Sequence, residues 1–173
     1  MQTDSYTLFH EHQSLIRSHF FVQIIIIICF LGGWWGFVQQ IIFGIPFGTN
    51  PASDIEMIII WIMVGWFIPI LMGVIGLDIE VTQKELRFRY KPFHFSDQVI
   101  LCSSILQADA DTYRSWYGWG IKYKKGIVSY TVSGNEGVYI TYQTPDGKEK
   151  TILLGSKNAG ELERVLFKTA RKW

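Results

Sequence analysis

Charged residues are missing from two long stretches of this 173-residue chain. Residues 18–53 and residues 57–77 contain no Asp, Glu, Lys or Arg. A helix of about 20 apolar residues crosses a hydrocarbon layer of about 30 Å, so each stretch is long enough to span a bilayer. We therefore expect two transmembrane helices, over about residues 19–43 and 57–77. Because neither helix carries a charged side chain, the chain lacks the usual parts of a proton relay or an ion pathway.

Cysteine is scarce too, with Cys29 in the first expected helix and Cys102 far along the chain. We expect no disulfide between them. A chain with only two cysteines is compatible with a reducing cytoplasm. No serine, cysteine or threonine lies in a recognisable motif with a base, so we expect no enzyme and no cofactor. The tail histidines lack the cysteines or carboxylates that would complete a metal site with them: His10, His12 and His19.

The flanking charges predict how the two helices cross the membrane. Residues 1–18 contain one arginine and two acids, unlike the basic start of a signal peptide, and we treat them as an N-terminal cytoplasmic segment. Residues 44–56, GIPFGTNPASDIE, contain helix-breaking Gly and Pro and only acidic charges. Lysine and arginine occur before the first helix and after the second, so the helices form a hairpin with both termini in the cytoplasm.

Two G-x-x-x-G pairs, Gly32 with Gly36 and Gly44 with Gly48, would let helix backbones approach closely. The neighbour could be the other helix of the hairpin, a second copy of the chain or another membrane protein, and the sequence leaves these alternatives open. Packing between the two helices also explains the tryptophans inside the spans: Trp34, Trp35, Trp61 and Trp66.

The rest of the chain, residues 78–173, has the composition of a soluble domain, with fifteen Lys and Arg against eleven Asp and Glu, a net charge of +4. Apolar and polar residues alternate in residues 77–83 and 86–91, which predicts two strands joined as a hairpin. Further short strands are predicted at residues 99–101, 105–108, 127–132, 137–143 and 148–154.

A helix is predicted at the C-terminus, because Asn158 stands three residues before Glu161 and apolar residues then recur on one helical face. The domain thus has about seven short antiparallel strands followed by one helix. This order is that of a pleckstrin-homology-like (PH-like) barrel, in which the helix closes one end of two nearly orthogonal sheets. The fold class we expect is α+β, a two-helix transmembrane hairpin followed by a PH-like antiparallel β-barrel.

Three motifs carry a resemblance to a known group of proteins: YGWGIKY at 117–123, YTVSGNEGVYI at 130–140 and LLGSKNAGEL at 153–162. In this order they resemble bacterial membrane proteins of uncharacterised function that have a PH-like domain after two transmembrane helices. The chain departs from their pattern by one residue fewer before Trp119, by Lys122 for arginine and by Ala159 for proline. The resemblance covers most of residues 57–170 and implies a fold and a bacterial plasma membrane, but no catalytic residue.

The window SWYGWGIKYKKG, residues 115–126, raises the possibility of a ligand loop. A phosphate loop would need a helix after its glycines, and the residues after Gly120 have the pattern of a strand. We expect no nucleic acid on a domain of such modest charge. The interpretation without a ligand is purely structural. It predicts a bend at Gly118 and Gly120, with Trp119 and Ile121 inside the barrel. The other residues expected to shape the fold are Gly134, Gly137, Gly155 and Ser156.

Basic residues near the membrane predict a weak, salt-sensitive contact with anionic lipid, worth about 1 kcal/mol for each Lys or Arg. The candidates are Arg87, Arg89, Lys91, Lys122, Lys124 and Lys125. A headgroup pocket like that of eukaryotic pleckstrin-homology domains is not expected, because the loop at residues 83–85 is too short. The sequence predicts a membrane-anchored, non-catalytic binding or scaffold module. The first alternative is a regulatory or assembly subunit of a membrane complex. The second, which the missing catalytic motifs disfavour, is a membrane-bound enzyme.

Overall fold

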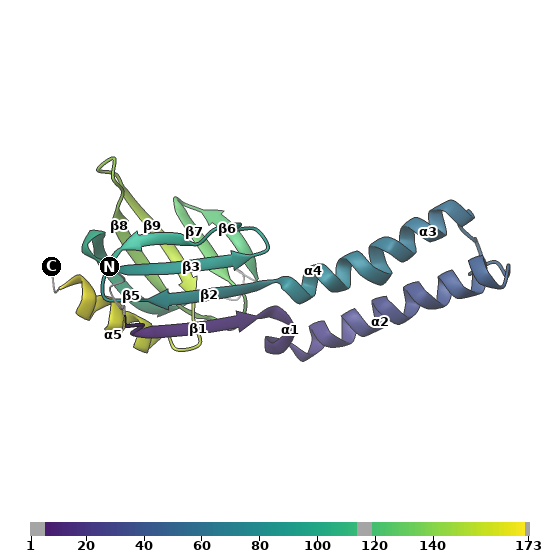
Figure 1. Ribbon diagram of the computed structural model, residues 1–173, viewed down its shortest axis with the longest axis horizontal. Coiled ribbons are helices and arrows are strands. Elements are labelled where there is room, and N and C mark those ends of the chain that lie inside the picture. Colours follow the sequence, from purple (N-terminus) through teal and green to yellow (C-terminus); the bar gives the residue numbers. More distant parts are fainter. Residues whose placement is uncertain (1–5, 114–118, 172–173) are drawn as a thin grey trace. The chain divides into compact units, whose positions relative to one another are not determined.

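The computed structural model describes residues 6–113 and 119–171, and the chain is an α+β protein (Figure 1). It divides into two compact units. Leu15–Ile75 form a helical unit, called the hairpin below. The described residues up to Ser14 and from Gly76 onward form the second unit, called the sheet domain. The sheet domain is therefore built from chain on both sides of the hairpin.

The hairpin contains two long apolar helices that run side by side (Figure 1). They cover Phe20–Ile42 and Asp54–Val74, with 23 and 21 residues. The predicted apolar helices are therefore present. Each long helix includes a π-helical segment, and the elements are α1 (Leu15–Ser18), α2 (Phe20–Phe37), the segment Val38–Ile42, α3 (Asp54–Ile62), the segment Met63–Phe67 and α4 (Ile68–Val74).

The second long helix begins and ends three residues earlier than predicted. Its start is fixed by a capping box, in which the Ser53 amide donates to Glu56 Oε2 at 2.8 Å and Ser53 Oγ accepts from the Glu56 amide at 3.4 Å. Its end is set by Gly76, which already belongs to a strand. The π-helical turn precedes Pro69, whose missing N–H and bulky ring disturb the helical hydrogen bonds on its N-terminal side.

Aromatic rings fill the space between the two helices. Trp61 stacks on Phe37 with ring centroids 4.3 Å apart and meets the edge of Trp34 at 5.3 Å. Trp34 also contacts Trp66 at 5.9 Å. Packing between helices, as predicted, accounts for these three tryptophans. Trp35 differs, because 67% of its surface is exposed.

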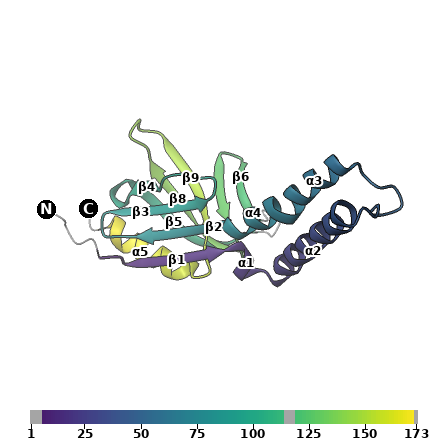
Figure 2. The same ribbon diagram turned by 45° about the vertical axis from the view of Figure 1, so that its right-hand side comes forward.

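The sheet domain contains two sheets (Figures 1 and 2). The first has the strand order β1-β2-β3-β4, and the second the order β5-β8-β9-β7-β6. Their bounds are β1 (Phe9–Ser14), β2 (Gly76–Val81), β3 (Glu85–Lys91), β4 (Gln98–Leu101), β5 (Ile105–Thr112), β6 (Gly120–Lys124), β7 (Ile127–Thr131), β8 (Glu136–Gln143) and β9 (Glu149–Gly155).

Three features of the predicted barrel were wrong. The two sheets do not close into a barrel, because no pairing among the described residues joins β4 to β6 or β1 to β5. Strand β7 pairs with β9 in parallel, so the sheets are not wholly antiparallel. The described residues also form nine strands, against about seven predicted. The sequence assigned residues 1–18 to a separate segment, but Phe9–Ser14 pairs with β2 along its whole length.

The core of the first sheet matches the predicted alternation. Leu77, Ile79 and Val81 of β2 are fully buried on one face, and Leu86, Phe88 and Tyr90 of β3 share that face. The predicted C-terminal helix is also present as α5 (Ala159–Ala170), which packs on β5 and β8 (Figure 1). Leu162 and Leu166 on its inner face are fully buried. The predicted strand pair β2–β3 and the terminal helix are thus confirmed.

Gly137 tests this packing most sharply. It pairs with Gly155 between β8 and β9, and a Cβ on Gly137 would lie 2.5 Å from the Leu154 carbonyl oxygen. Backbone cannot move aside cheaply in a central strand, so Gly137→Ala should lower the free energy of unfolding by about 1–3 kcal/mol, or several degrees in thermal unfolding of the detergent-solubilised chain. Gly160→Ala is the matched control, because a Cβ there meets nothing within 4 Å and alanine favours a helix. Equal melting temperatures for both variants would contradict the predicted close approach.

Candidate functional site

The basic residues predicted on β3 lie on the outer face of the first sheet, where acids pair with them. Lys91 Nζ is 2.8 Å from Asp78 Oδ2, and Arg89 Nη1 is 3.9 Å from Asp97 Oδ1. Arg87 forms an ion pair with Glu85. Because each cation has a nearby carboxylate, this face is a mixed network rather than a uniformly basic surface.

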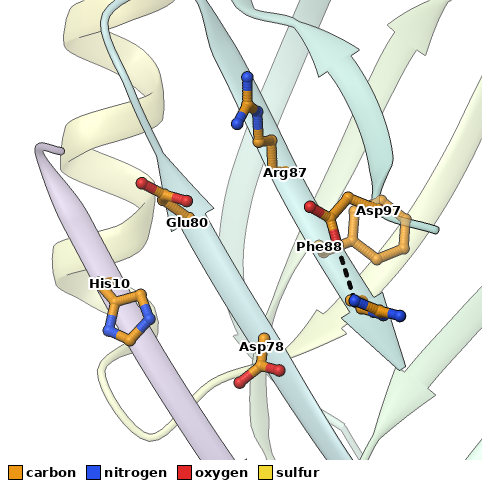
Figure 3. Close-up of a pocket in the computed structure, with 7 residues that line it drawn as sticks. His10, Asp78, Glu80, Arg87, Phe88 and Asp97 are labelled. Atoms are coloured by element: carbon orange, nitrogen blue, oxygen red, sulfur yellow. Dashed lines mark ion pairs between the residues drawn. The ribbon is translucent and has the colours of Figure 1, made fainter. Parts of the chain in front are cut away.

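Figure 3 shows a shallow pocket on the same face, between β1, β2 and β3. His10, Glu80 and Arg87 lie side by side on these three neighbouring strands. The pocket holds only about 60 Å³, too little for an organic ligand. Among the described residues no group of three His, Cys, Asp or Glu side chains could hold a metal ion. This face therefore forms ion pairs but has no pocket that could hold a ligand.

Asp78 is the centre of this network. It lies between Lys91 and His12, and forms an ion pair with each of them. Burial alone would raise the pKa of the Asp78 carboxyl, but hydrogen bonds from Lys91 and His12 outweigh it and hold that pKa below its usual range. The carboxylate therefore stabilises the first sheet at neutral pH, and this contribution is lost as the pH falls through the lowered pKa.

The three predicted lysines of the other group lie elsewhere. Lys122 and Lys124 belong to β6, at the edge of the second sheet, and Lys125 lies in the turn to β7 with a positive φ of 51°. The structure thus divides the six predicted basic residues between two sheets. Their contact with lipid stays a prediction.

Trp119 and Ile121 do not fill a core. Their exposed fractions are 47% and 38%, so the prediction that they are buried was wrong. Gly120 next to them has φ of 119°, a conformation that requires glycine, and the predicted bend is present there. Gly118 lies outside the described residues. The large loss of stability that truncation of a buried tryptophan brings is therefore not expected at Trp119.

The exposure of β6 follows from the cross-strand register of the second sheet. Ile140, Ile152, Val128 and Tyr123 lie opposite one another across β8, β9, β7 and β6. The first two are 0% and 5% exposed, whereas Tyr123 is 76% exposed. The inner face of this sheet is covered at β8 and open at β6. Among the described residues, no strand of the first sheet pairs with β6.

A cavity of about 470 Å³ lies at this open side, between β4 of the first sheet and the inner face of the second. Among its walls are Phe88 and Ile100 from the first sheet, and Val128, Tyr130, Tyr142 and Lys150 from the second. This volume falls within the range of about 300–1,000 Å³ that small-molecule sites occupy. It is the candidate functional site of the sheet domain.

Tyr130 and Tyr142 of the cavity are partly buried, and Tyr130 lies beside aromatic rings. The ring of Tyr130 is 5.0 Å from Phe88 and 5.3 Å from His94. Burial raises the pKa of Tyr130 and, by the same cause, that of Tyr142. Both phenols are therefore protonated at neutral pH, so each hydroxyl can donate a hydrogen bond.

The predicted glycine and serine motif before α5 lies at a second polar cluster, called the Glu11 clasp below. Ser156 Oγ donates to Glu11 Oε2 at 2.5 Å, and the Lys157 amide donates to Glu11 Oε1 at 2.8 Å. Gln13 Nε2 donates to Glu11 Oε1 at 2.9 Å and to the Gly155 carbonyl at 2.8 Å. These bonds join β1 to the corner between β9 and α5.

The clasp is buried and closed on itself. Glu11, Gln13 and Ser156 are 8%, 1% and 1% exposed, and Ser133 Oγ donates to Gln13 Oε1 at 3.1 Å. Gly134, after Ser133, has φ of 77°, so the turn that places Ser133 needs glycine. The clasp leaves no room for a ligand. Its role is to hold the fold.

Neither the clasp nor the cavity was predicted from the sequence. Glu11 and Gln13 are polar, so β1 shows no apolar alternation, and only their spacing of two residues hinted at a strand. The cavity tyrosines belong to three different strands, and no local motif joins them. Gly155 and Ser156 were identified, and the clasp supplies their reason.

Removing the charge at Glu11 tests the clasp. In Glu11→Gln the new amide would face donors from Ser156 and the Lys157 amide, and the free energy of unfolding should fall by about 1–3 kcal/mol. Glu149→Gln is the matched control, because this exposed glutamate should change stability by about 0.5 kcal/mol or less. Thermal unfolding of the detergent-solubilised full chain measures both. A melting temperature of Glu11→Gln equal to that of Glu149→Gln would show that the clasp does not stabilise the fold.

Comparison with known families assigns nearly the whole chain to one family. A search of curated proteins finds no match to the chain. The model of a family of unknown function, DUF6141, matches residues 2–172, which include both apolar helices, both sheets and α5. The chain therefore belongs to the family of unknown function DUF6141.

Proposed function

We propose that this protein is a membrane-anchored, non-catalytic binding module of a bacterial plasma membrane, with both termini in the cytoplasm. The observation that carries the proposal is the exposure of the two apolar helices. Only 17% of the apolar window of the first helix and 11% of that of the second are buried. Core helices of soluble proteins bury such faces, whereas a lipid bilayer solvates them.

Single residues show the same pattern. Phe21, Trp35 and Ile55 of the hairpin are 78%, 67% and 72% exposed. Leaving apolar surface in water costs about 25 cal/mol for each Å², so a hairpin of this kind needs an apolar environment. The loop between its helices, residues 43–53, carries no charged residue, and the two acids that follow it, Asp54 and Glu56, lie in the first turn of α3. The absence of Lys and Arg there agrees with a loop outside the cytoplasm.

The sheet domain would then be the cytoplasmic binding part. A PH-like relationship belongs to this proposal, and the two sheets followed by a C-terminal helix support it. The cavity at the open side of the sheets supplies a site for binding. Lys122, Lys124 and Lys125 stay candidates for lipid contact. Arg87, Arg89 and Lys91 are less available for it, because each forms an ion pair with an acid.

Cysteine labelling tests the anchoring and the topology. Ser53 caps α3, so a cysteine at the neighbouring exposed Thr49 reports the loop without loss of the cap. We expect a membrane-impermeant maleimide to label Thr49→Cys in intact cells, and Asp146→Cys in the sheet domain only after permeabilisation. The parent chain measures the background from Cys29 and Cys102. Labelling of Asp146→Cys from outside, or recovery of the chain in the soluble fraction, would contradict the proposal.

A second candidate function, a subunit that docks on partner helices in the membrane, is favoured by the glycines of α2. Gly33 is in contact with Gly65 inside the hairpin, where its Cβ would lie 3.1 Å from Gly65 Cα. A Cβ on Gly32 would meet nothing within 4 Å, and Gly32 lines an apolar groove of about 470 Å³. The hairpin therefore uses Gly33 and leaves Gly32 open to a neighbour, which the proposal identifies as a helix of a second copy or of another membrane protein.

Substitution at Gly32 tests this second candidate. If a partner helix docks there, Gly32→Leu should remove cross-linked adducts of the chain in native membranes, because leucine fills the groove without disturbing the hairpin. Ile25→Leu, at another exposed position of α2, is the control and should leave the adducts unchanged. Adducts of equal amount in Gly32→Leu and the parent would contradict docking at the groove.

A further inference from the structure

We propose that the cavity between β4 and the second sheet binds a small organic anion, a carboxylate or phosphate attached to an apolar body. This inference rests on the proposed binding function and names its ligand class. The cavity lies wholly within the sheet domain and is lined from both sheets. A ligand there would lie in the space that a closed barrel would fill with its own side chains.

The walls provide a place for an apolar body. Phe88, Ile100 and Ile152 are 4%, 5% and 5% exposed and form the floor of the cavity with Val128. Towards β6 the wall continues over Tyr123, which is 76% exposed. An apolar ligand surface placed against this wall would be removed from water, at a gain of about 25 cal/mol for each Å².

The polar groups of the cavity are donors. Among the described residues, none of the hydrogen bonds uses the hydroxyl of Tyr130 or Tyr142, and none of the ion pairs includes Lys150. Tyr142 lies directly opposite Lys150 in the pairing of β8 with β9, so the two side chains are on the same face of the sheet, and both line the cavity. An anion is the ligand group that accepts from both.

The charge of the lining points the same way. Lys150 is the one charged residue among the described residues that line the cavity, and no carboxylate joins it there. Its neighbour Glu149 lies on the opposite face of β9, because side chains alternate along a strand. Lys150 is exposed, and an anionic ligand is the kind whose charge complements its ammonium.

The size of the cavity favours a small molecule over a protein segment. Its volume of about 470 Å³ holds a molecule of drug size, and pockets of this kind combine an apolar wall with a few converging polar groups. The anion could come from the cytoplasm or from a lipid headgroup, since both sources present the same chemistry. Nanodiscs with and without an anionic lipid distinguish the two sources.

The test uses the full chain in nanodiscs of uncharged phosphatidylcholine, with naphthalene-2-carboxylate as the probe. Its neutral carboxamide is the matched ligand, and empty nanodiscs correct for partition into lipid. Isothermal titration calorimetry should show saturable binding of the carboxylate at least about tenfold tighter than that of the carboxamide, because only the carboxylate pairs with Lys150.

Two variants and one control locate the binding. Lys150→Gln and Tyr142→Phe keep the shape of the cavity. They should weaken the affinity for the carboxylate by about tenfold and about threefold, respectively. Lys148→Gln, in the neighbouring turn outside the cavity, should stay within about twofold of the parent. Equal binding of carboxylate and carboxamide, equal effects at Lys148 and Lys150, or no saturable binding would overturn the inference.

Nanodiscs that also contain phosphatidylglycerol distinguish the two sources of the anion. If the natural ligand is a lipid headgroup, the anionic lipid should compete with the probe in the parent chain. If it is a soluble anion, the probe should bind equally in both kinds of nanodisc. A chain that passes the labelling test of topology but binds no probe loses this inference alone, and the anchoring proposal stands.

Discussion

The buried carboxylate of Glu11 is the interaction on which the sheet domain depends most. It draws hydrogen bonds from the Ser156 hydroxyl and from the Lys157 amide, residues that follow β9 and precede α5. A buried carboxylate without such partners would cost several kcal/mol, so the corner at Ser156 and the strand β1 must form together. Because β1 directly precedes the hairpin and β2 directly follows it, the clasp unites two parts of the chain that the apolar helices separate.

The clasp also explains why the domain has one closed side and one open side. On the β1 side of the first sheet, Glu11 and Gln13 tie the strand to the end of β9. On the opposite side β4 is only four residues long, and no strand pairing among the described residues joins it to the second sheet. The inner face of β6 is left uncovered there, and the cavity lies between these edges. The two sheets are thus joined by the clasp at the β1 edge and are open at the β4 edge, where the cavity lies.

The parts of the fold that were predictable from sequence depend on local patterns. The absence of charge predicted two apolar helices, alternation predicted β2 and β3, and Asn158 with Glu161 predicted the start of α5. Strand β1 was missed because two of its three inward side chains, Glu11 and Gln13, are polar, and the partner of Glu11 lies 145 residues further along the chain. Trp119 and Ile121 were predicted inside a closed barrel, but both are exposed and the two sheets do not close. How far one sheet covers the other depends on tertiary packing, which leaves no pattern in the local sequence. The cavity could therefore not be predicted.

Hydrogen exchange of the full chain in nanodiscs, followed by mass spectrometry, tests most directly whether β1 belongs to the same cooperative unit as the rest of the sheet domain. If the clasp unites them, backbone amides of Phe9–Ser14 exchange only with the global unfolding that also exposes β2, β8 and β9. The peptides of these four strands should then show the same high protection. Exchange of the β1 amides within seconds, while β8 and β9 stay protected for hours, would contradict this and make residues 9–14 a separate tail.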